Sequence, residues 1–296
     1  MYLILGASGY IGLKLLRALG PSQAIGTHNN NSAPGTVCFD ATASSVENIL
    51  AGLTSISHAY IVYAEADVDA CKADIDRSRL INVESTKSVI DQLLERGIKP
   101  IFMSSEYVFD GELGNYSDDD AAQPTTVYGG QKQEIEQYLA KSGADYAVLR
   151  LAKVYGTDLE DHTILSGWAR QIHSGEVIRC ARDQVFSPVH VDDVVEASIA
   201  SARLNLSGVF NVAGPEPTSR LNMLQVLLKH IEAKAEVDEC SLNDFDFLDF
   251  RPLDLSMTPQ KILKATGLSF RSVDSCCQEL AQKLRKTASG QVITHG

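Results

Sequence analysis

Near its N-terminus the chain has a short apolar segment that leads through a glycine-rich loop into an apolar helical pattern. The segment reads Leu3-Ile4-Leu5-Gly6-Ala7-Ser8-Gly9-Tyr10-Ile11-Gly12. Glycines at these spacings satisfy three steric demands: a tight turn, close approach of a pyrophosphate to the backbone, and close packing of helix on strand. The helix N-terminus adds free N–H groups and the positive end of the helix dipole. We therefore predict a nucleotide-binding loop whose contact residues are Gly6, Ser8, Gly9, Tyr10, Ile11 and Gly12.

Short apolar runs alternate with amphipathic helical patterns up to about residue 155, which indicates βαβ units and a parallel sheet. The predicted strands are Tyr2–Leu5, Ala24–Gly26, Val37–Phe39, Ala59–Tyr63, Pro100–Met103, Ala147–Leu151 and, later, Val209–Val212. The predicted fold class is α/β: a Rossmann-type, doubly wound parallel sheet with a smaller C-terminal substrate-binding lobe. We assign residues 1–155 to the sheet domain, which later strands complete, residues 156–286 mainly to the interleaved lobe, and residues 287–296 to a frayed tail.

The composition excludes several classes of function. The formal net charge is -12 and no basic cluster is present, so a nucleic-acid partner is not expected. No apolar run approaches the ~20 residues that a membrane span needs. The six cysteines have neither metal-ligand spacing nor a compact disulfide pattern. We expect free thiols, no metal site and a cytoplasmic protein.

The end of the second strand bears on the choice of coenzyme. A carboxylate there would bind the ribose 2′-hydroxyl of NAD, but the sequence continues through His28 and Asn29 without one. This favours NADP(H), with NAD(H) still open, because no arginine follows to hold a 2′-phosphate. Asp40, followed by Ala41, ends the third strand and is expected to reach the adenine amine.

Tyr128 and Lys132 form a YxxxK pair that shares one face of a helix. A phenol has a pKa of about 10, and a neighbouring cation favours the phenolate, so the pair suits proton transfer coupled to hydride transfer by a nicotinamide. Ser104 and Ser105 follow the fifth predicted strand, whose carboxyl end faces the ligand crevice of such a sheet. Ser105, Tyr128 and Lys132 are the predicted catalytic residues.

These features together resemble the extended short-chain dehydrogenase/reductases, and among them the dTDP-4-dehydrorhamnose reductase-like group. Further segments fit in order: Asn82-Val83-Glu84-Ser85-Thr86, Ser104 to Gly111, Val127-Tyr128-Gly129, Arg150 to Gly156, Ser187 to Asp193, and Arg251-Pro252. The resemblance implies that Ser105 replaces the family's catalytic Thr/Ser, that Tyr128 donates the proton, and that Lys132 binds the nicotinamide ribose and lowers the tyrosine pKa. It also implies a cofactor contact by the backbone near Ala152, and it allows a homodimer.

Other cofactor neighbours expected from the resemblance are Asn82, which braces the central helix, Ser104, and the loop Ala64, Glu65 and Ala66. That loop departs from the group's pattern, and Glu65 would either reject a phosphate or reach the substrate. Lys153 replaces a tryptophan that faces the sugar in rhamnose-forming reductases, so it either meets a carboxylate or pyrophosphate or points to solvent. The expected substrate contacts are Ser105, Glu106, Tyr107, Lys153 and, as bidentate binders of a diphosphate, Arg182 and Arg251.

Three functions fit these residues. The leading hypothesis is an NAD(P)H-dependent reductase of a nucleotide-linked keto-sugar. A sugar-nucleotide epimerase or dehydratase with retained NAD is the second, although Tyr107 stands where a dehydratase needs a second acid. The third is a non-catalytic NADP-binding subunit, similar to the regulatory β subunit of methionine adenosyltransferase.

Overall fold

The computed structural model describes residues 1–51 and 55–288. Its first unit is a strand, β1 (Tyr2–Leu5), joined by the glycine loop to a helix, α1 (Tyr10–Leu19). Leu3, Ile4 and Leu5 have no exposed surface, so β1 lies inside a sheet with both faces covered. The apolar side of α1 packs back on this strand, as the sequence predicts.

Seven parallel strands form the central sheet, in the order β11-β6-β5-β4-β1-β2-β3. The others are β2 (Ala24–His28), β3 (Thr36–Cys38), β4 (His58–Ile61), β5 (Lys99–Ser105), β6 (Ala147–Leu151) and β11 (Gly208–Val212). All seven strands are parallel, but β2 and β3 lie on one side of β1, whereas β4 and the later strands lie on the other side. The strand order therefore reverses between β1 and β4, and in such sheets a ligand crevice opens there, at the carboxyl ends of the strands. The predicted fold class is confirmed. β5 continues past the predicted Met103 and includes Ser104 and Ser105.

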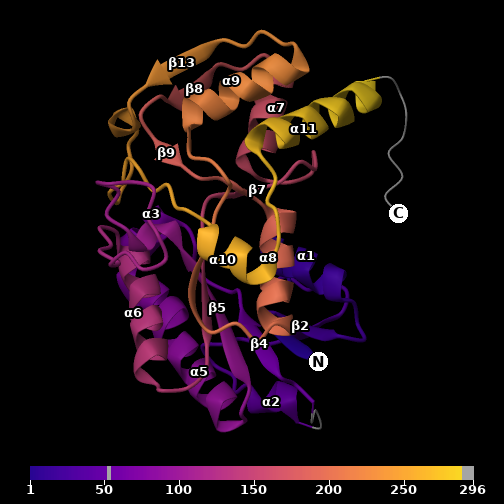
Figure 1. Cartoon of the computed structure of the whole chain (residues 1–296), viewed down its shortest axis with the longest axis vertical. Helices are drawn as coiled ribbons and strands as arrows, with labels where there is room; N and C mark the ends of the chain where they lie inside the picture. Colours follow the sequence, from indigo (N-terminus) through magenta and orange to yellow (C-terminus); the bar gives the residue numbers. More distant parts are fainter. Residues whose placement is uncertain (52–54, 289–296) are drawn as a thin grey trace.

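Helices cover both faces of this sheet (Figure 1). One hydrophobic cluster joins a face of the sheet to α1, α8 (Val191–Arg203) and α10 (Gln260–Thr266). A second cluster joins the opposite face to α2 (Glu47–Leu50), α5 (Ser85–Glu95) and α6 (Val127–Lys141). Short helical segments connect these elements: α3 (Val68–Ala73), α4 (Ile75–Arg79), a π-helical turn η1 (Leu80–Glu84) and a 3₁₀ turn η2 (Glu106–Val108).

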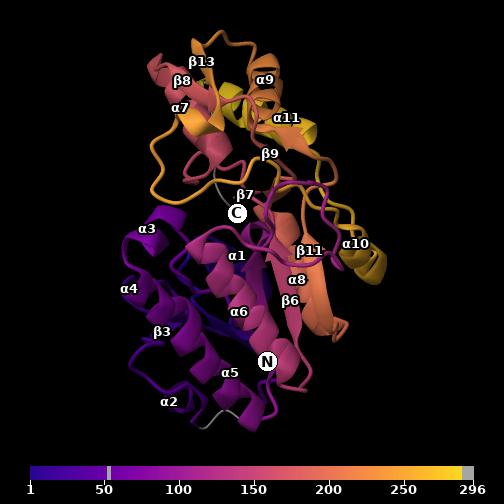
Figure 2. The same cartoon turned by 90° about the vertical axis from the view of Figure 1, so that its left-hand side faces the viewer.

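A smaller α/β body sits beyond the carboxyl ends of the strands and has its own hydrophobic cluster (Figures 1 and 2). It contains α7 (Ile164–Ser174), β8 (Ile178–Ala181), α9 (Arg220–Ile231), β13 (Val237–Cys240), η3 (Leu242–Asp244) and α11 (Val273–Ala288). Short strand pairs complete the fold: β7 (Val154–Tyr155) with β10 (Val189–His190), and β9 (Val185–Phe186) with β12 (Thr218–Ser219). We refer to this body as the lobe.

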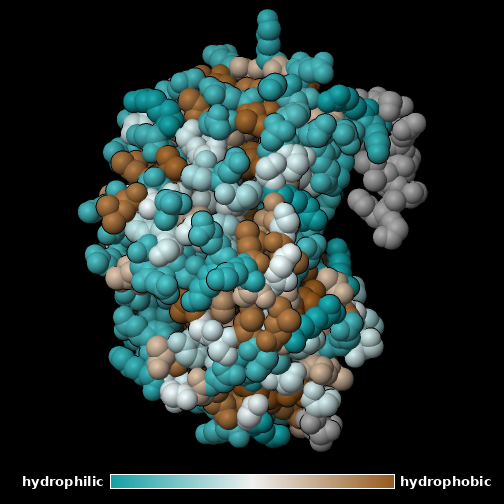
Figure 3. Space-filling model, in the orientation of Figure 1, coloured by the Kyte–Doolittle hydropathy of each residue, from teal (hydrophilic) through white to brown (hydrophobic). Residues whose placement is uncertain are grey.

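Thr287 and Ala288 belong to α11, and the remainder of the predicted tail, 289–296, lies outside the described residues. Among the helices of the described ranges, none combines the length and the apolar character that a membrane crossing requires. On the face drawn in Figure 3, apolar side chains reach the surface as separate patches between hydrophilic ones.

Candidate active site

The glycine loop has the close contacts that its sequence predicts. Gly6 has a φ of +91°, and a Cβ there would lie 2.7 Å from the backbone nitrogen of Tyr63. A Cβ on Gly12 would lie 2.4 Å from the carbonyl oxygen of Gly6. The hydroxyl of Thr27 accepts the N–H of Gly6 at 3.0 Å and fixes the start of the loop. A larger residue at Gly12 would push α1 away from the glycine loop, and one at Gly6 would collide with Tyr63 after β4.

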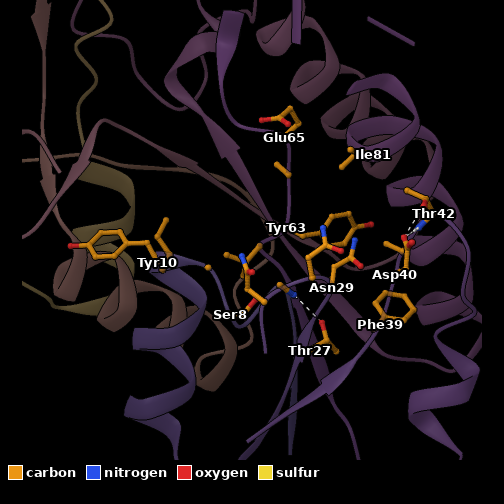
Figure 4. A pocket seen from close by; sticks show the side chains of 18 of the residues that line it. Ser8, Tyr10, Thr27, Asn29, Phe39, Asp40, Thr42, Tyr63, Glu65 and Ile81 are labelled. Carbon is orange, nitrogen blue, oxygen red and sulfur yellow. Dashed lines mark hydrogen bonds between the residues drawn. The ribbon is translucent and has the colours of Figure 1, made fainter. Parts of the chain in front are cut away.

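This loop borders a cavity of about 480 Å³. In Figure 4, Asn29, Phe39, Asp40 and Thr42 gather at one end of it, and Tyr10 lies at the other. The predicted residues that line it are Gly6, Ser8, Gly9, Tyr10, Ile11, Asn29, Asp40, Ala41, Ala64 and Glu65. Lining residues that the sequence analysis did not single out are Thr27, Asn30, Asn31, Phe39, Thr42, Val62, Tyr63, Arg77 and Ile81. We call this space the nucleotide cavity.

Two predicted contacts near the adenosine end differ in the structure. His28 is not among the lining residues, because its Nδ1 lies 2.7 Å from the Thr36 hydroxyl on the neighbouring strand. Oδ1 of Asp40 accepts the N–H and the hydroxyl of Thr42, so this oxygen already shapes the turn. Arg77 supplies an arginine that the sequence analysis did not place at this cavity.

Asn82 lies in the π-helical turn η1 and connects the β4 loop to α6. Its Oδ1 accepts the N–H of Glu65 at 2.8 Å, and its Nδ2 donates to the carbonyl of Glu65 at 2.9 Å and to Oε1 of Gln131 at 2.7 Å. This geometry gives Asn82 the bracing contact that the resemblance implies. It holds Glu65 at the cavity wall, while the neighbouring Ala66 is exposed and outside the lining set.

Ser105 and Tyr128 come together where β5 ends and α6 begins. Ser105 caps η2 by accepting the N–H of Tyr107, and Thr126 caps α6 by accepting the N–H of Gly129. A Cβ on Gly129 would lie 2.0 Å from the Tyr107 carbonyl oxygen, so a glycine is required for this approach. The rings of Tyr107 and Tyr128 contact each other edge to face, with 6.0 Å between centroids.

Lys132 lies one helical turn after Tyr128 and is buried beneath it. Its Nζ donates to the Met103 carbonyl at 2.9 Å and lies 4.7 Å from the centroid of the Phe102 ring and 5.7 Å from that of the Tyr128 ring. Desolvation lowers the pKa of Lys132 to about 8. Burial raises the pKa of Tyr128, and a hydrogen bond with Ser105 acts against that increase. In this structure the Lys132 ammonium is directed to the Met103 carbonyl, and its lowering of the tyrosine pKa stays a prediction.

Ser104 is directed away from the crevice. Its hydroxyl donates to Glu136, which also forms a buried bidentate pair with Arg150. Ala152 is buried directly after β6, and its N–H donates to the Val212 carbonyl at 3.0 Å. Ser104 thus stabilises the α6–β6 interior through its side chain, whereas Ala152 lies at the carboxyl edge of the sheet.

Glu106 and Lys153 meet on the side of the crevice that faces the lobe. Oε2 of Glu106 accepts the backbone N–H of Lys153 at 3.1 Å. Burial raises the pKa of Glu106 to about 7, against the effects of the Lys153 charge and of this hydrogen bond. Burial and the charge of Glu106 raise the pKa of Tyr107 to about 12. Glu106, Tyr107 and Lys153 thus form a row of polar groups that leads from Ser105 toward the lobe.

The two arginines predicted for the diphosphate are placed differently. Arg182 is exposed next to β8 and lines none of the described cavities. Arg251 pairs with Asp69 at 2.9 Å, donates to the Asp249 carbonyl at 3.1 Å, and lies over the Phe247 ring. Arg251 thus fastens the segment after η3 to α3, and its charge already has a partner.

A second cavity of about 570 Å³ lies between the glycine loop and the lobe. We call it the lobe-side cavity; its lining residues are Tyr10, Lys153, Val154, Glu160, Asp161, His162, Thr163, Ile164 and Arg220. Arg220 is the first residue of α9 and matches no motif, so only its charge could have drawn attention to it. In the described ranges, no group of three or more His, Cys, Asp or Glu side chains has the arrangement of a metal site.

Comparison with known proteins identifies relatives over almost the whole chain. A family model described as "RmlD substrate binding domain" matches residues 1–286. The probable low-salt glycan biosynthesis reductase Agl14 of Haloferax volcanii is 24% identical over 84% of this chain and 86% of that protein. The methionine adenosyltransferase 2 subunit beta of Rattus norvegicus is 26% identical over 54% of this chain and 50% of that protein. A crystal structure of dTDP-4-dehydrorhamnose reductase from Bacillus anthracis in complex with NADP superposes with a TM-score of 0.83 at 21% identity, covering 95% of this chain and 98% of that one.

Proposed function

The chain belongs to the RmlD substrate binding domain family, and from that premise we propose that it is an NAD(P)H-dependent reductase of a nucleotide-linked keto-sugar. The observation that carries the proposal is the convergence of Ser105, Tyr128 and Lys132 at the carboxyl edge of the sheet, in a fold whose switch-point crevice contains the nucleotide cavity. Relatives described as reductases support the same class of reaction.

The nucleotide cavity fits a dinucleotide on the evidence of its own contacts. At Gly6 and Gly12 a Cβ would collide with backbone, and the loop they shape leads into the N-terminus of α1, which favours a pyrophosphate. Bound NAD(P)H supplies the hydride. The proposal assigns the nicotinamide ribose end to the backbone at Ala152 and to Lys132, at the carboxyl edge of the sheet.

The protein's own part of the reaction is to polarise a carbonyl and to supply a proton. Ser105 donates a hydrogen bond to the carbonyl oxygen, and Tyr128 transfers its phenolic proton to the oxygen as the hydride arrives. Because burial raises the pKa of Tyr128, the phenol is protonated at neutral pH. A protonated phenol is the form needed for reduction, whereas an epimerase must first withdraw a proton from a hydroxyl.

We propose NADPH as the preferred coenzyme. No carboxylate follows β2, and the polar residues Asn29, Asn30 and Asn31 line the cavity there together with Arg77. A 2′-phosphate would find amide donors and a guanidinium at this end of the cavity. All six cysteines are free and five of them are buried, which supports a cytoplasmic protein.

The test is oxidation of NADPH and NADH with a panel of nucleotide-linked keto-sugars, with Tyr128→Phe measured alongside. We expect the variant to lose about 100-fold or more in kcat, the usual contribution of a positioned acid. Tyr138→Phe is the matched control, because that phenol lies on the same helix but bonds to Asp91 at the surface. Retained activity in Tyr128→Phe would contradict the mechanism. Tight coenzyme binding without turnover, together with a stoichiometric partner protein, would favour a regulatory subunit instead.

A further inference from the structure

Two cations, Lys153 and Arg220, lie on the wall of the lobe-side cavity, and the charge of the nearby Glu106 acts on both. Lys153 is exposed to the cavity, and within the described ranges neither Lys153 nor Arg220 forms an ion pair. The Nε of Arg220 donates to Oε1 of Gln184 at 2.8 Å, which fixes the guanidinium, and within residues 1–51 and 55–288 its two terminal nitrogens make no hydrogen bond. A fixed guanidinium with free terminal N–H groups can bind a planar carboxylate in a bidentate way.

The two cations disfavour each other in the absence of an anion. The side chain of Lys153 keeps solvent-exposed surface but lies in a cleft, and desolvation by the cleft, followed by the charge of Arg220, lowers the pKa of Lys153. Desolvation also lowers the pKa of Arg220. Like charges in a desolvated cleft repel more strongly than in water, so an anion bound between them would relieve both effects.

The acidic groups around the cavity do not provide that anion. Asp161 accepts the Tyr10 hydroxyl at 2.8 Å and lies 4.0 Å from the Lys14 ammonium. Glu106 accepts the backbone N–H of Lys153, and burial raises the pKa of Glu106 to about 7, which favours its neutral form. Glu160 and the titratable His162 are exposed on the loop before α7. Of the described residues that line the cavity, Lys153 and Arg220 are thus the cations available to a ligand anion, and Glu160 is an exposed carboxylate on the loop before α7.

The cations lie at the reacting end of the crevice. Lys153 follows Ala152 at the carboxyl edge of β6. Its backbone N–H donates a hydrogen bond to Glu106, the residue after Ser105. The charge of Arg220 acts on Glu106 and on Tyr107, whose ring contacts Tyr128. A substrate carbonyl between Ser105 and Tyr128 would thus place the sugar, rather than the distant nucleotide base, beside Lys153 and Arg220.

We propose that Lys153 and Arg220 together bind a carboxylate carried by the sugar, so that the substrates are acidic nucleotide sugars. The inference rests on the proposed function for the orientation of the sugar. It makes Lys153 and Arg220 specificity-determining residues, and it assigns the lobe-side cavity to the acidic substituent. A neutral deoxy-sugar would leave both cations desolvated and unmatched.

The test compares UDP-glucuronic acid with UDP-glucose, which differ only by the carboxylate. Binding of each to the NADP⁺-loaded protein is measured by calorimetry. We expect the wild-type protein to bind the acid about 10-fold more tightly, since charge-assisted bidentate pairing is roughly twice as strong as neutral hydrogen bonding. Lys153→Met and Arg220→Gln should each reduce that preference to about twofold, and Lys153→Arg should retain it.

Lys264→Met and Arg203→Gln are matched controls, because both residues are exposed on helices away from the cavity. Equal weakening of both ligands by Lys153→Met and Arg220→Gln would assign the cations to the diphosphate and overturn the proposal. Equal binding of the two ligands by the wild-type protein would overturn it as well. The binding readout is independent of turnover: carboxylate preference without any keto-sugar reduction would refute the reductase and keep the anion site, and reduction of neutral keto-sugars without that preference would do the reverse.

Discussion

The two sides of the crevice differ in the kinds of residue that line them. The nucleotide cavity is bounded by a glycine loop and by residues that directly follow β1, β2, β3 and β4, so backbone groups and small polar side chains form much of its surface. The lobe-side cavity is bounded by charged side chains from a loop after β6, a loop before α7 and the start of α9. The first surface suits a ligand shared by many proteins. The second surface can change with single substitutions and is therefore where substrate choice is expected to reside.

The strongest test of this contrast is a methyl group on the glycine loop. In Gly12→Ala the added Cβ would lie 2.4 Å from the Gly6 carbonyl oxygen, and backbone cannot move aside easily. Overpacking of this kind costs up to about 3 kcal/mol, so we expect the Kd for NADPH to rise by about 100-fold.

Gly167→Ala is the lobe control, since a Cβ there has nothing within 4 Å. It should leave NADPH binding unchanged and stabilise α7 by roughly 0.5–1 kcal/mol. Equal NADPH binding by Gly12→Ala and the wild-type protein, measured by fluorescence titration, would remove the steric argument for the loop.

A second test uses the buried carboxyl of Glu106. Its pKa is raised from 4.5 to about 7, so its neutral form is favoured in the folded state. Its contribution to stability is present below pH 4.5 and is lost as the pH rises through 7. Glu106→Gln keeps an acceptor for the Lys153 N–H and has no charge to bury.

We expect Glu106→Gln to match the wild type at pH 5 and to exceed its free energy of unfolding at pH 8 by on the order of 2 kcal/mol. Urea denaturation at the two pH values measures the difference. A variant that is less stable than the wild type at pH 8 would mean that the ionised carboxylate is stabilising.

A third test concerns the segment after η3, which passes from the lobe to α3 (Figure 2) and contacts it there. Asp69 accepts the N–H groups of Leu248 and Asp249 and pairs with Arg251. Burial acts to raise the pKa of Asp69, but these hydrogen bonds and the Arg251 charge hold it below its usual value.

Asp69→Asn keeps the acceptor and removes the charge. Exposed ion pairs are worth about 1 kcal/mol or less, so we expect the substrate KM to rise about fivefold while the Kd for NADPH is unaffected. Steady-state kinetics and coenzyme titration check both values. A change confined to coenzyme binding would show that this contact serves the nucleotide side.

The smallest expected effect is on coenzyme preference. Arg77 is exposed at the edge of the nucleotide cavity, so its attraction for a 2′-phosphate is screened by solvent. Arg77→Gln should lower the ratio of kcat/KM for NADPH over NADH by about threefold, as exposed pairs usually give. Lys72→Gln, a charge change on nearby α3 outside the cavity, is the control. An unchanged ratio would leave the asparagines as the only phosphate donors proposed.

The same contrast explains how far the sequence could predict the site. The glycines of the loop and the Tyr128–Lys132 pair are local patterns, and the strands around them follow from apolar periodicity. Individual hydrogen bonds, which the sequence does not show, decide where other side chains point. The His28 ring contacts the Thr36 hydroxyl, and the Lys132 ammonium donates to the Met103 carbonyl. Arg251 is a residue type that binds anions, but in the structure it forms an ion pair with Asp69. Arg220 and Lys153 line one cavity only through the tertiary fold, and no spacing in the chain predicts that placement.

The central claim is that hydride transfer takes place between the two sides of this crevice. The most direct measurement is to mix the protein with NADPH deuterated at the transferred position and with nucleotide-linked keto-sugars, acidic and neutral, and to analyse the products by mass spectrometry and NMR. We predict one deuterium on the new carbinol carbon, transfer at least about 100-fold slower with Tyr128→Phe, and faster transfer to acidic sugars. Stable NADPH binding with no deuterium transferred to any keto-sugar would contradict it.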